Sequence, residues 1–532
     1  MMTVLTGVSR ATGFVRVAVV TNVLGVTYLA NTYQTANTIP NILFELFAAG
    51  ALQAVLIPAM VDILGVSRSA RGNDPETDHV IGAVLGLTCS VLGVLAAAAM
   101  IAGPTLMRLM VNDVADPAVR AAEVRLGTFF LWFFLPQVVL YGANAVATAV
   151  LNSTGSFGIP VIAPAINNVV VIGVYLSFAA LRAGQPPSLD LTVTEKVVLA
   201  GGTSLGVLLF CALPIAAAHR RVPLRPNLDH RHPRIRRLAR DGGWAISYLA
   251  CTQALLVVIL QLTNRREGAV AIYTLAWVVF LLPHSLLSVP VLTTRFPTMS
   301  RQALAGEWDG YGDTFGRGVR SICFVALPSA ALLAAMATPL ARLVVHGETA
   351  HSAGEIGAAI RGFAPGLLGL GMFLFLTRAC YALGDMRSPT WANLVAAVVG
   401  AGGMIAVADE VAPRLLVASL GAVYAAAQSA AAVILLVVVY RRLHREGAHA
   451  ARAVVPTLRT LVAAMAAGVV AYAVVMTVPE DVRTVALVGY LAVSGLLGGA
   501  VYLLTYAVLG GPGPRRALRS FGADDRAVAV SR

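Results

Sequence analysis

The stretch VVLAGGTSLGVLLFCALPIAAA, residues 197–218, carries no charged side chain over 22 positions. A helix of roughly 20 residues crosses the hydrocarbon core of a bilayer, which is about 30 Å thick. Similar runs recur through all 532 residues, of which 58% are hydrophobic and only 12% are charged. A soluble protein would carry roughly a quarter charged residues. We therefore predict an all-α polytopic membrane protein.

Within this stretch, Gly202-Thr203-Ser204-Leu205-Gly206 matches the GxSxG pattern of a nucleophilic serine. The pattern requires a strand before the serine, and an apolar helical run stands there instead. Close helix packing at Gly202 and Gly206 is the interpretation we prefer. No catalytic residue is predicted.

Apolar runs between charged or Gly/Pro-rich breaks predict about fourteen transmembrane helices. Their approximate limits are 4–25, 32–64, 79–107, 124–151, 159–181, 194–218, 241–264, 268–299, 316–345, 358–383, 389–408, 413–440, 454–478 and 484–510.

Sequence landmarks repeat at an offset of roughly 230–240 residues, which predicts two related halves. Phe134-Leu135-Pro136 matches Phe363-Ala364-Pro365, and a further proline, Pro160 or Pro389, follows each 24 residues later. The other matched pairs are Ile57–Met60 with Phe296–Met299 and Pro104–Leu109 with Pro339–Leu343. Prolines that simply end or kink membrane helices are the alternative explanation.

Six spans per repeat imply two parallel six-helix lobes followed by two additional C-terminal helices. The predicted parts are an N-lobe (1–220), a C-lobe (221–445) joined by an arginine-rich linker (220–240), a helix pair (446–510) and a tail (511–532).

Arginine sets the predicted orientation, since Lys196 is the only lysine. With fourteen spans, the arginine-rich segments 219–240, 441–452 and 515–532 fall on one face together with the N-terminus. The positive-inside rule then places both termini in the cytoplasm. Binding of anionic lipid is the alternative role for the linker. No basic stripe with interleaved aromatic residues indicates nucleic-acid binding, despite a net charge of +13.

No cofactor and no metal site are predicted. The only lysine lacks a phosphate-binding glycine loop, and His230 and His232 have no ligand partners at metal spacing. Any uphill transport would use the membrane potential, H⁺ or Na⁺.

Polar residues inside membrane spans are costly and mark cavities or helix contacts. Arg10 and Arg16 lie in the first span, offset by ~120° and ~9 Å on a helix. They could border one cavity or extend to the cytoplasmic interface.

The second span carries Asn31 and a polar face formed by Gln34, Asn37, Asn41 and Glu45. Pro40 within it is a predicted hinge. We interpret this face as a cavity wall, and a hydrogen-bonded seam between helices remains the alternative. Arg295 and Arg378 are candidate anion-binding residues of the second half, whereas Asn144, Asn152, Asn167 and Asn168 are interpreted as structural hydrogen-bonders.

Several of these residues resemble motifs of the MurJ/MviN family, the lipid II flippases of bacterial cell-wall synthesis. Residues 9–16 (SRATGFVR) resemble the opening SRxxGFxR of that family, and residues 30–41 and 50–58 resemble its ADxxxxAxxxPN and GAxxxxxxP segments. Leu151-Asn152 with Ile159-Pro160, and Tyr381–Asp385 with Pro389, are similar to later family landmarks. The composition is that of a divergent, actinobacterial-type member.

The resemblance implies the fold of the MOP exporter superfamily, with two lobes around a cationic cavity and a groove for the polyprenyl tail at the last two helices. On this basis we predict alternating access that moves lipid II or a related polyprenyl-diphosphate lipid to the outer leaflet of the bacterial plasma membrane, with the lobes rocking about hinges at Pro40 and Pro283. Arg10 and Arg16 would attract the diphosphate. Cell-wall synthesis proteins are possible partners.

This sequence departs from the family pattern at three charged positions. Asn31 stands where the family has an acidic residue, and Phe44 and Val278 stand where it has arginines. Arg295 or Arg378 could compensate. The alternatives are a cation-coupled multidrug antiporter, which would need a carboxylate such as Glu45, and a non-transporting cell-wall scaffold.

Overall fold

The computed structural model describes residues 2–46, 75–229, 243–447, 454–479 and 482–511, and every regular element within them is a helix. The chain divides into two compact units, Met1–Ala271 and Ile272–Arg532, which are described separately below. The predicted all-α architecture is confirmed.

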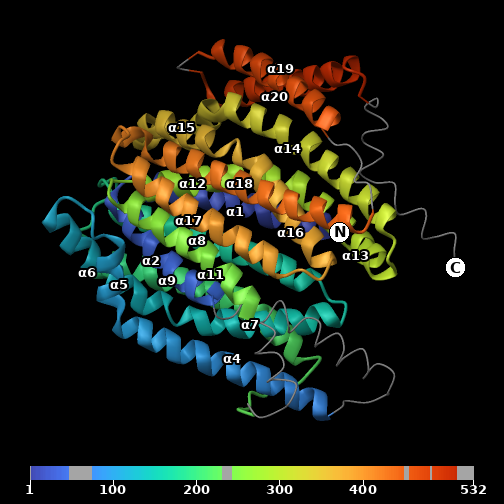
Figure 1. Cartoon of the computed structure of the whole chain (residues 1–532). Helices are drawn as coiled ribbons and strands as arrows, with labels where there is room; N and C mark the ends of the chain where they lie inside the picture. The colour runs from blue at the N-terminus through green and yellow to red at the C-terminus, as the bar shows by residue number, and fades with distance from the viewer. Residues whose placement is uncertain (1, 47–74, 230–242, 448–453, 480–481, 512–532) are drawn as a thin grey trace. The chain divides into compact units, whose positions relative to one another are not determined.

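The first unit contains nine described helices (Figure 1). They are α1 (Met2–Leu24), α2 (Tyr28–Phe44), α4 (Pro75–Ile101), α5 (Gly103–Met110), α6 (Pro117–Phe134), α7 (Gln137–Ser153), α8 (Gly158–Arg182), α9 (Val193–His219) and α11 (Gly243–Asn264).

The core of this unit forms around the ring of Tyr33 on α2. Phe130 and Phe134 of α6 meet that ring edge-on, with centroids 5.7 and 5.8 Å away. All three side chains are buried. Edge-to-face pairs add roughly 0.5–1.5 kcal/mol each beyond area burial, so this cluster fixes α2 against α6.

Glycines allow α8 and α9 to pack closely, as the sequence predicted. A Cβ on Gly202 would lie 2.5 Å from a methyl of Val174, and one on Gly206 would lie 2.7 Å from Oδ1 of Asn167. Both distances are shorter than a Cβ tolerates, so only glycine permits this approach.

The first unit extends beyond the predicted lobe boundary at residue 220, because α11 packs with it. Asn264 and Thr35 of α2 exchange hydrogen bonds of 3.0 and 3.3 Å, and Arg265 pairs with Asp113 at 2.8 Å. Gln261 donates to the carbonyl of Leu109 at 3.1 Å. These polar contacts, which hydropathy does not reveal, hold α11 in the first compact unit, which ends at Ala271.

The second unit contains the remaining elements. They are α12 (Ala269–Pro283, whose first residues belong to the first unit), η2 (His284–Ser288), α13 (Val289–Ala305), α14 (Trp308–Val344), η3 (Gly347–Ser352), α15 (Ala353–Phe363), α16 (Gly366–Ala382), α17 (Arg387–Ala408), η4 (Pro413–Leu415), α18 (Leu416–Arg445), α19 (Val454–Met476) and α20 (Thr484–Val508).

The last two helices pack against each other and against α14 (Figure 1). Small residues of α19, such as Ala467, allow the close approach, and the hydroxyl of Tyr502 on α20 donates to the carbonyl of Phe324 on α14 at 2.7 Å. The pair predicted as a separate part at 446–510 therefore belongs to the second compact unit.

The repeat landmarks occupy equivalent helix positions in the two units. α6 ends at Phe134 just before Pro136, and α15 ends at Phe363 just before Pro365. Pro160 is the third residue of α8, and Pro389 is the third residue of α17. These landmarks thus mark corresponding helix breaks in the two units. The pair Pro104 and Pro339 differs, because α5 starts at Gly103, next to Pro104, whereas α14 continues without a break through Pro339.

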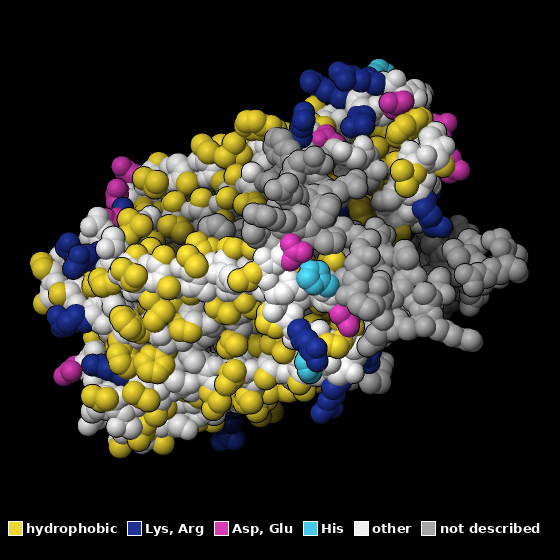
Figure 2. Space-filling view, turned by 90° about the horizontal axis from the view of Figure 1, so that it is seen from below, with side chains coloured by type: hydrophobic (Ala, Val, Ile, Leu, Met, Phe, Trp, Pro, Cys, Tyr) yellow, Lys and Arg dark blue, Asp and Glu magenta, His cyan; other side chains and the backbone are white. Residues whose placement is uncertain are grey.

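Twelve stretches of the described residues are long and apolar enough to cross a bilayer, and they correspond to the third to fourteenth predicted spans. α1 and α2 occupy the first two, and α2 has only 17 described residues. The count of fourteen therefore stays a prediction. Hydrophobic side chains are spread over much of the described surface seen in Figure 2. Large apolar residues such as Val398 and Leu496 are exposed, as a bilayer requires.

Several predictions fall outside the described residues. They concern the end of the second span at 47–64, the landmark Ile57–Met60, the motif at 50–58, most of the arginine linker with His230 and His232, and the tail beyond residue 511.

Candidate functional site

A polar pocket of about 280 Å³ lies inside the first unit, among α1, α2, α7, α8 and α9. Its polar lining consists of one arginine, four asparagines, three tyrosines and one threonine: Arg16; Asn37, Asn41, Asn167 and Asn168; Tyr33, Tyr141 and Tyr175; and Thr203. No acidic side chain is among the described residues that line it.

Arg16 supplies the charge of this pocket. It is half-buried on α1, whereas Arg10 is exposed and does not line the pocket. The face of α1 that carries Ser9 and Thr12 packs on α8, where the amide of Asn168 donates to the Ser9 carbonyl at 3.4 Å and to the Thr12 hydroxyl at 3.2 Å. Of the two arginines, for which the sequence left a cavity role and an interface role open, Arg16 lines this pocket and Arg10 does not.

The polar face predicted on α2 reaches the pocket at two positions. Asn37 and Asn41 both line it, and the amide of Asn41 donates to the carbonyl of Asn37 at 3.0 Å. Gln34 is buried, and neither atom of its amide has a hydrogen-bond partner among the described residues. Glu45 follows the last residue of α2, half-buried and outside the pocket lining.

Asn31 does not line the pocket, because both ends of its side chain are bound to backbone. Its amide donates to the carbonyl of Arg266 at 2.8 Å, and its oxygen accepts from the N–H of Val270 at 3.1 Å. The side chain is fully buried. Asn31 therefore holds the turn after α11. This is the role in a hydrogen-bonded seam that the sequence offered as the alternative to a cavity wall.

Tyrosine hydroxyls form one wall of the pocket, although no pattern in the sequence marks them as site residues. The hydroxyl of Tyr33 lies 3.1 Å from that of Tyr175 and 2.7 Å from that of Thr203. Thr203 in turn donates to the carbonyl of Leu199. A buried tyrosine usually finds a partner for its hydroxyl, but sequence spacing does not tell which helix provides it.

Asn167 and Asn168 were interpreted as structural hydrogen-bonders, and the structure places both on the pocket wall. Asn168 has the structural bonds to α1 described above. Oδ1 of Asn167 is buried and has no partner among the described residues. A buried amide oxygen without a partner costs roughly 1–3 kcal/mol, so a ligand or water that donates to it would be favoured.

The pocket is suited to an anion. Arg16 offers five N–H donors in a planar fork that matches phosphate geometry, and the surrounding amides and hydroxyls can donate further hydrogen bonds. The volume is near the lower end for small-molecule sites. It suits a diphosphate or one sugar rather than a whole lipid-linked saccharide.

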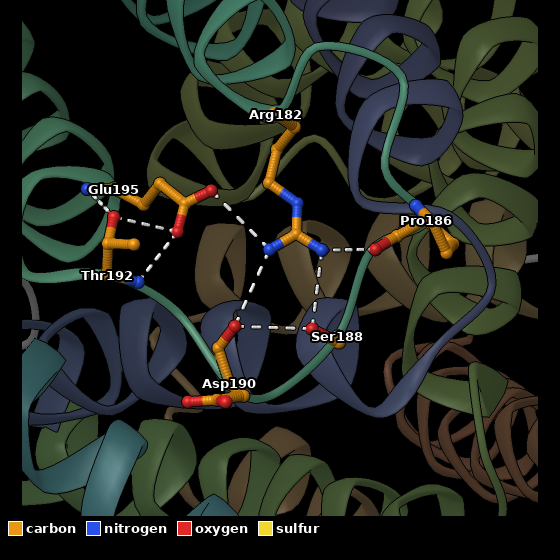
Figure 3. A network of polar contacts seen from close by, with 6 residues as sticks. All are labelled: Arg182, Pro186, Ser188, Asp190, Thr192 and Glu195. Carbon is orange, nitrogen blue, oxygen red and sulfur yellow. Dashed lines mark hydrogen bonds and ion pairs between the residues drawn. The ribbon is translucent and has the colours of Figure 1, made fainter.

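A polar network fixes the loop between α8 and α9, which together supply most of the pocket wall (Figure 3). Arg182 at the end of α8 pairs with Glu195 at 3.4 Å, and both are buried. Arg182 also donates to the backbone carbonyls of Pro186 and Asp190. Thr192 and Glu195 form a capping box at the start of α9.

Phe44 and Val278 stand where the resemblance places arginines. The ring of Phe44 packs on Tyr141 with centroids 5.5 Å apart, and Val278 is a partly buried residue of α12. Neither position therefore contributes a charge.

The other predicted arginines lie in the second unit. Arg295 on α13 is buried and has interaction partners, and Arg378 on α16 is half-buried.

The two predicted hinges differ in their local backbone. Pro40 is buried inside α2, which continues to Phe44. Pro283 ends α12, and the π-helical turn His284–Ser288 follows it directly. π-helical turns interrupt the regular hydrogen bonding of an α-helix and are frequent at functional sites.

An apolar pocket of about 510 Å³ lies in the second unit, among α14, α16, α18 and α19. Leu368, Met372, Leu436, Leu458 and Leu461 provide much of its wall. A flexible hydrocarbon chain fits such a lining better than a polar solute does.

Two helical units of matching design, with an arginine pocket in one and an apolar pocket in the other, define a class: polytopic membrane transport proteins. A solved structure titled "Lipid II flippase MurJ, inward closed conformation" has this fold, with a TM-score of 0.73 at 16% identity over 95% of this chain and 98% of that one. An inward-facing multidrug resistance MATE family transporter of the MOP superfamily matches with a TM-score of 0.63 at 15% identity, over 82% of this chain and 95% of that one.

Sequence comparison gives the family. The family model "Lipid II flippase MurJ" matches residues 20–491. The lipid II flippase MurJ of Burkholderia cenocepacia is 26% identical over 72% of this chain and 72% of its own length. The probable lipid II flippase MurJ of Haemophilus influenzae is 26% identical over 75% and 78%. This chain belongs to the MurJ family of lipid II flippases.

Proposed function

We propose that this protein moves lipid II, or a closely related polyprenyl-diphosphate-linked cell-wall precursor, from the cytoplasmic to the outer leaflet by alternating access. The observation that carries the proposal is the polar pocket in which Arg16 is the charged group. Membership of the lipid II flippase family supplies the substrate class.

Arg16 would bind the diphosphate, with the amides of Asn37 and Asn41 donating to its oxygens. Oδ1 of Asn167 would accept from a hydroxyl of the attached sugar. A hydrogen bond to a charged group contributes roughly 1.5–3 kcal/mol, which amounts to about 10- to 150-fold in affinity. Arg10, which is exposed on the same helix, would attract the headgroup before it enters. Arg295 and Arg378 are further candidates for diphosphate contact during the cycle.

The apolar pocket among α14, α16, α18 and α19 would hold part of the polyprenyl tail. Burying hydrocarbon contributes about 0.8 kcal/mol for each CH₂. A tail held there while the headgroup crosses elsewhere would let a lipid of this size move without carrying its whole tail through a polar pathway.

The proposed setting is the bacterial plasma membrane with both termini in the cytoplasm. The irregular backbone after Pro283, and Pro40 inside α2, would absorb the helix movements of the cycle. Membrane potential or an ion gradient would reset the carrier, and cell-wall synthesis proteins are candidate partners.

The experiment replaces Arg16 by Ala and by Lys in a strain depleted of its own flippase. We expect Arg16→Ala to abolish growth and lipid II export, and Arg16→Lys to retain part of both, because lysine keeps the charge but not the planar fork. The matched control is Arg414→Ala, an exposed arginine of the second unit. Unimpaired export by Arg16→Ala would refute the assigned role.

A multidrug antiporter is the second candidate, and it predicts a carboxylate that binds a cation in the transport cavity. The polar pocket has arginine in its lining and no acidic side chain among the described residues. We therefore favour the anionic lipid. Glu45→Gln abolishing drug efflux would reverse this choice.

A further inference from the structure

A carboxylate is buried in the first unit, away from the polar pocket lining. Glu123 of α6 is 0% exposed. It lies six residues after the first residue of α6, about 9 Å along the helix axis. A buried ionisable group in a membrane protein is costly and is a functional-site candidate by default.

The hydrogen bonds around Glu123 indicate its protonation state. The hydroxyl of Thr32 lies 3.0 Å from Oε1 of Glu123 and 2.8 Å from the backbone carbonyl of Tyr28. A hydroxyl has one hydrogen to donate, so it cannot donate to both oxygens. If Glu123 is the neutral acid, it donates to Thr32, and Thr32 donates to Tyr28. A carboxylate would leave two acceptors facing each other.

A carboxylate at this position would have no ion-pair partner among the residues that the structure describes. Glu123 forms no ion pair within the described part of the chain, and Oε2 is buried without a partner there. An isolated buried carboxylate is far less stable than the neutral acid. The geometry and the burial thus both favour a bound proton.

The charged and titratable groups on the surrounding elements do not change this conclusion. On α2 the nearby group is Tyr28, and on the turn after α11 it is Glu267, whose charge repels one on Glu123. Arg108 of α5 is exposed, and Glu195 of α9 is paired with Arg182. Helix α7 carries Tyr141 as its titratable side chain and has no acidic or basic residue.

The hydrogen-bond partner of Glu123 is Thr32, which lies on α2, one of the helices that line the polar pocket. Thr32 lies between Asn31, which holds the turn at 266–270, and Tyr33, whose hydroxyl forms the pocket wall. Loss of the proton would turn the Thr32 hydroxyl toward the carboxylate and away from the Tyr28 carbonyl, and would favour hydration of Oε2, which has no partner among the described residues. Water entering at Oε2 would loosen α2 from α6. A single proton can therefore change how the pocket-lining helix is held.

We propose that Glu123 is the proton-binding site that couples this carrier to a proton gradient, one proton moving inward for each lipid-linked anion that moves outward. On release, the O–H bond of the neutral acid breaks and the proton passes to water; on binding, the reverse occurs. The proposal rests on the proposed lipid transport, which it deepens by naming the coupling ion and its site.

The test uses the full chain in vesicles that contain fluorescent lipid II, with the lipid in each leaflet measured by quenching. A gradient of one pH unit, acid on the side to which lipid is exported, supports up to about a tenfold ratio between leaflets for one proton per cycle. We expect wild type and the exposed-residue control Glu410→Gln to approach that ratio. Glu123→Gln, which cannot release a proton, should stay near an even distribution, and Thr32→Val should reduce the response.

A second measurement does not depend on a variant that folds. Dicyclohexylcarbodiimide reacts with neutral buried acids and not with carboxylates, so mass spectrometry of wild type should find Glu123 modified at acidic pH and less so as the pH rises. An unmodified Glu123, a full pH response in Glu123→Gln, or a wild type driven by a Na⁺ gradient and not by pH would each overturn the proposal. Lipid movement without any pH response refutes the coupling alone, whereas no lipid movement in wild type refutes the proposed function.

Discussion

Replacing Asn31 by alanine separates a structural role from a substrate-binding role on the same helix. Asn31 is fully buried, and it joins α2 to the turn after α11 through the carbonyl of Arg266 and the N–H of Val270. Alanine removes both hydrogen bonds and leaves two backbone groups without their partner. The free energy of unfolding of the first unit should therefore fall.

The size of the effect follows from the two bonds. Hydrogen bonds between membrane helices average about 0.6 kcal/mol and reach about 1.7 kcal/mol. Two bonds then give about 1–3 kcal/mol. With a shift of roughly 2–4 °C per kcal/mol for a unit of a few hundred residues, the melting temperature of Asn31→Ala should fall by about 2–12 °C.

The assay is thermal unfolding of the purified protein in detergent, together with lipid II flipping at increasing lipid concentration. The matched control is Asn37→Ala, since Asn37 lies on the same helix and lines the pocket. We expect the control to keep its melting temperature and to lose apparent affinity for lipid. If Asn31→Ala melts like wild type and loses affinity instead, Asn31 contacts substrate and its assigned structural role is wrong.

Three further substitutions probe the pocket and an exposed loop. Gly206→Leu should push the Asn167 amide into the pocket and lower flipping at least tenfold in vesicles, whereas normal flipping would show that this wall is not used. Tyr33→Phe keeps the ring but removes the hydroxyl, so thermal unfolding should show a loss of about 1 kcal/mol; a stability equal to wild type would contradict the network. Although burial acts to raise the pKa of Asp385, hydrogen bonds from Ser388 and the backbone lower it below its ordinary value. This carboxylate therefore adds stability above its unfolded-state pKa that is lost as pH falls through the lower, folded-state pKa. Ser388→Ala should decrease that stability at neutral pH and move its loss on acidification to higher pH, as measured by unfolding against pH; an unchanged profile would refute this.

The sequence predicted features that depend on local composition and period. The apolar stretch 197–218 and its equivalents predicted membrane helices, because a bilayer requires about twenty apolar residues in a row. Gly202 and Gly206 predicted close packing, and the breaks before Pro136 and Pro365 predicted the repeat. Resemblance in the first sixty residues predicted the family, which the match over residues 20–491 establishes.

Only the tertiary structure decided which polar residues meet. Arg10 and Arg16 look equivalent in sequence, yet of the two Arg16 lines the pocket. Asn31 and Asn37 lie on the same helix, but Asn31 is bound to the turn after α11, whereas Asn37 lines the pocket. Tyr33, Tyr175 and Thr203 come from three helices whose sequence separation is up to 170 residues. Hydropathy and spacing describe one helix at a time, whereas a pocket and a proton site such as Glu123 depend on neighbours that the chain brings together only by folding.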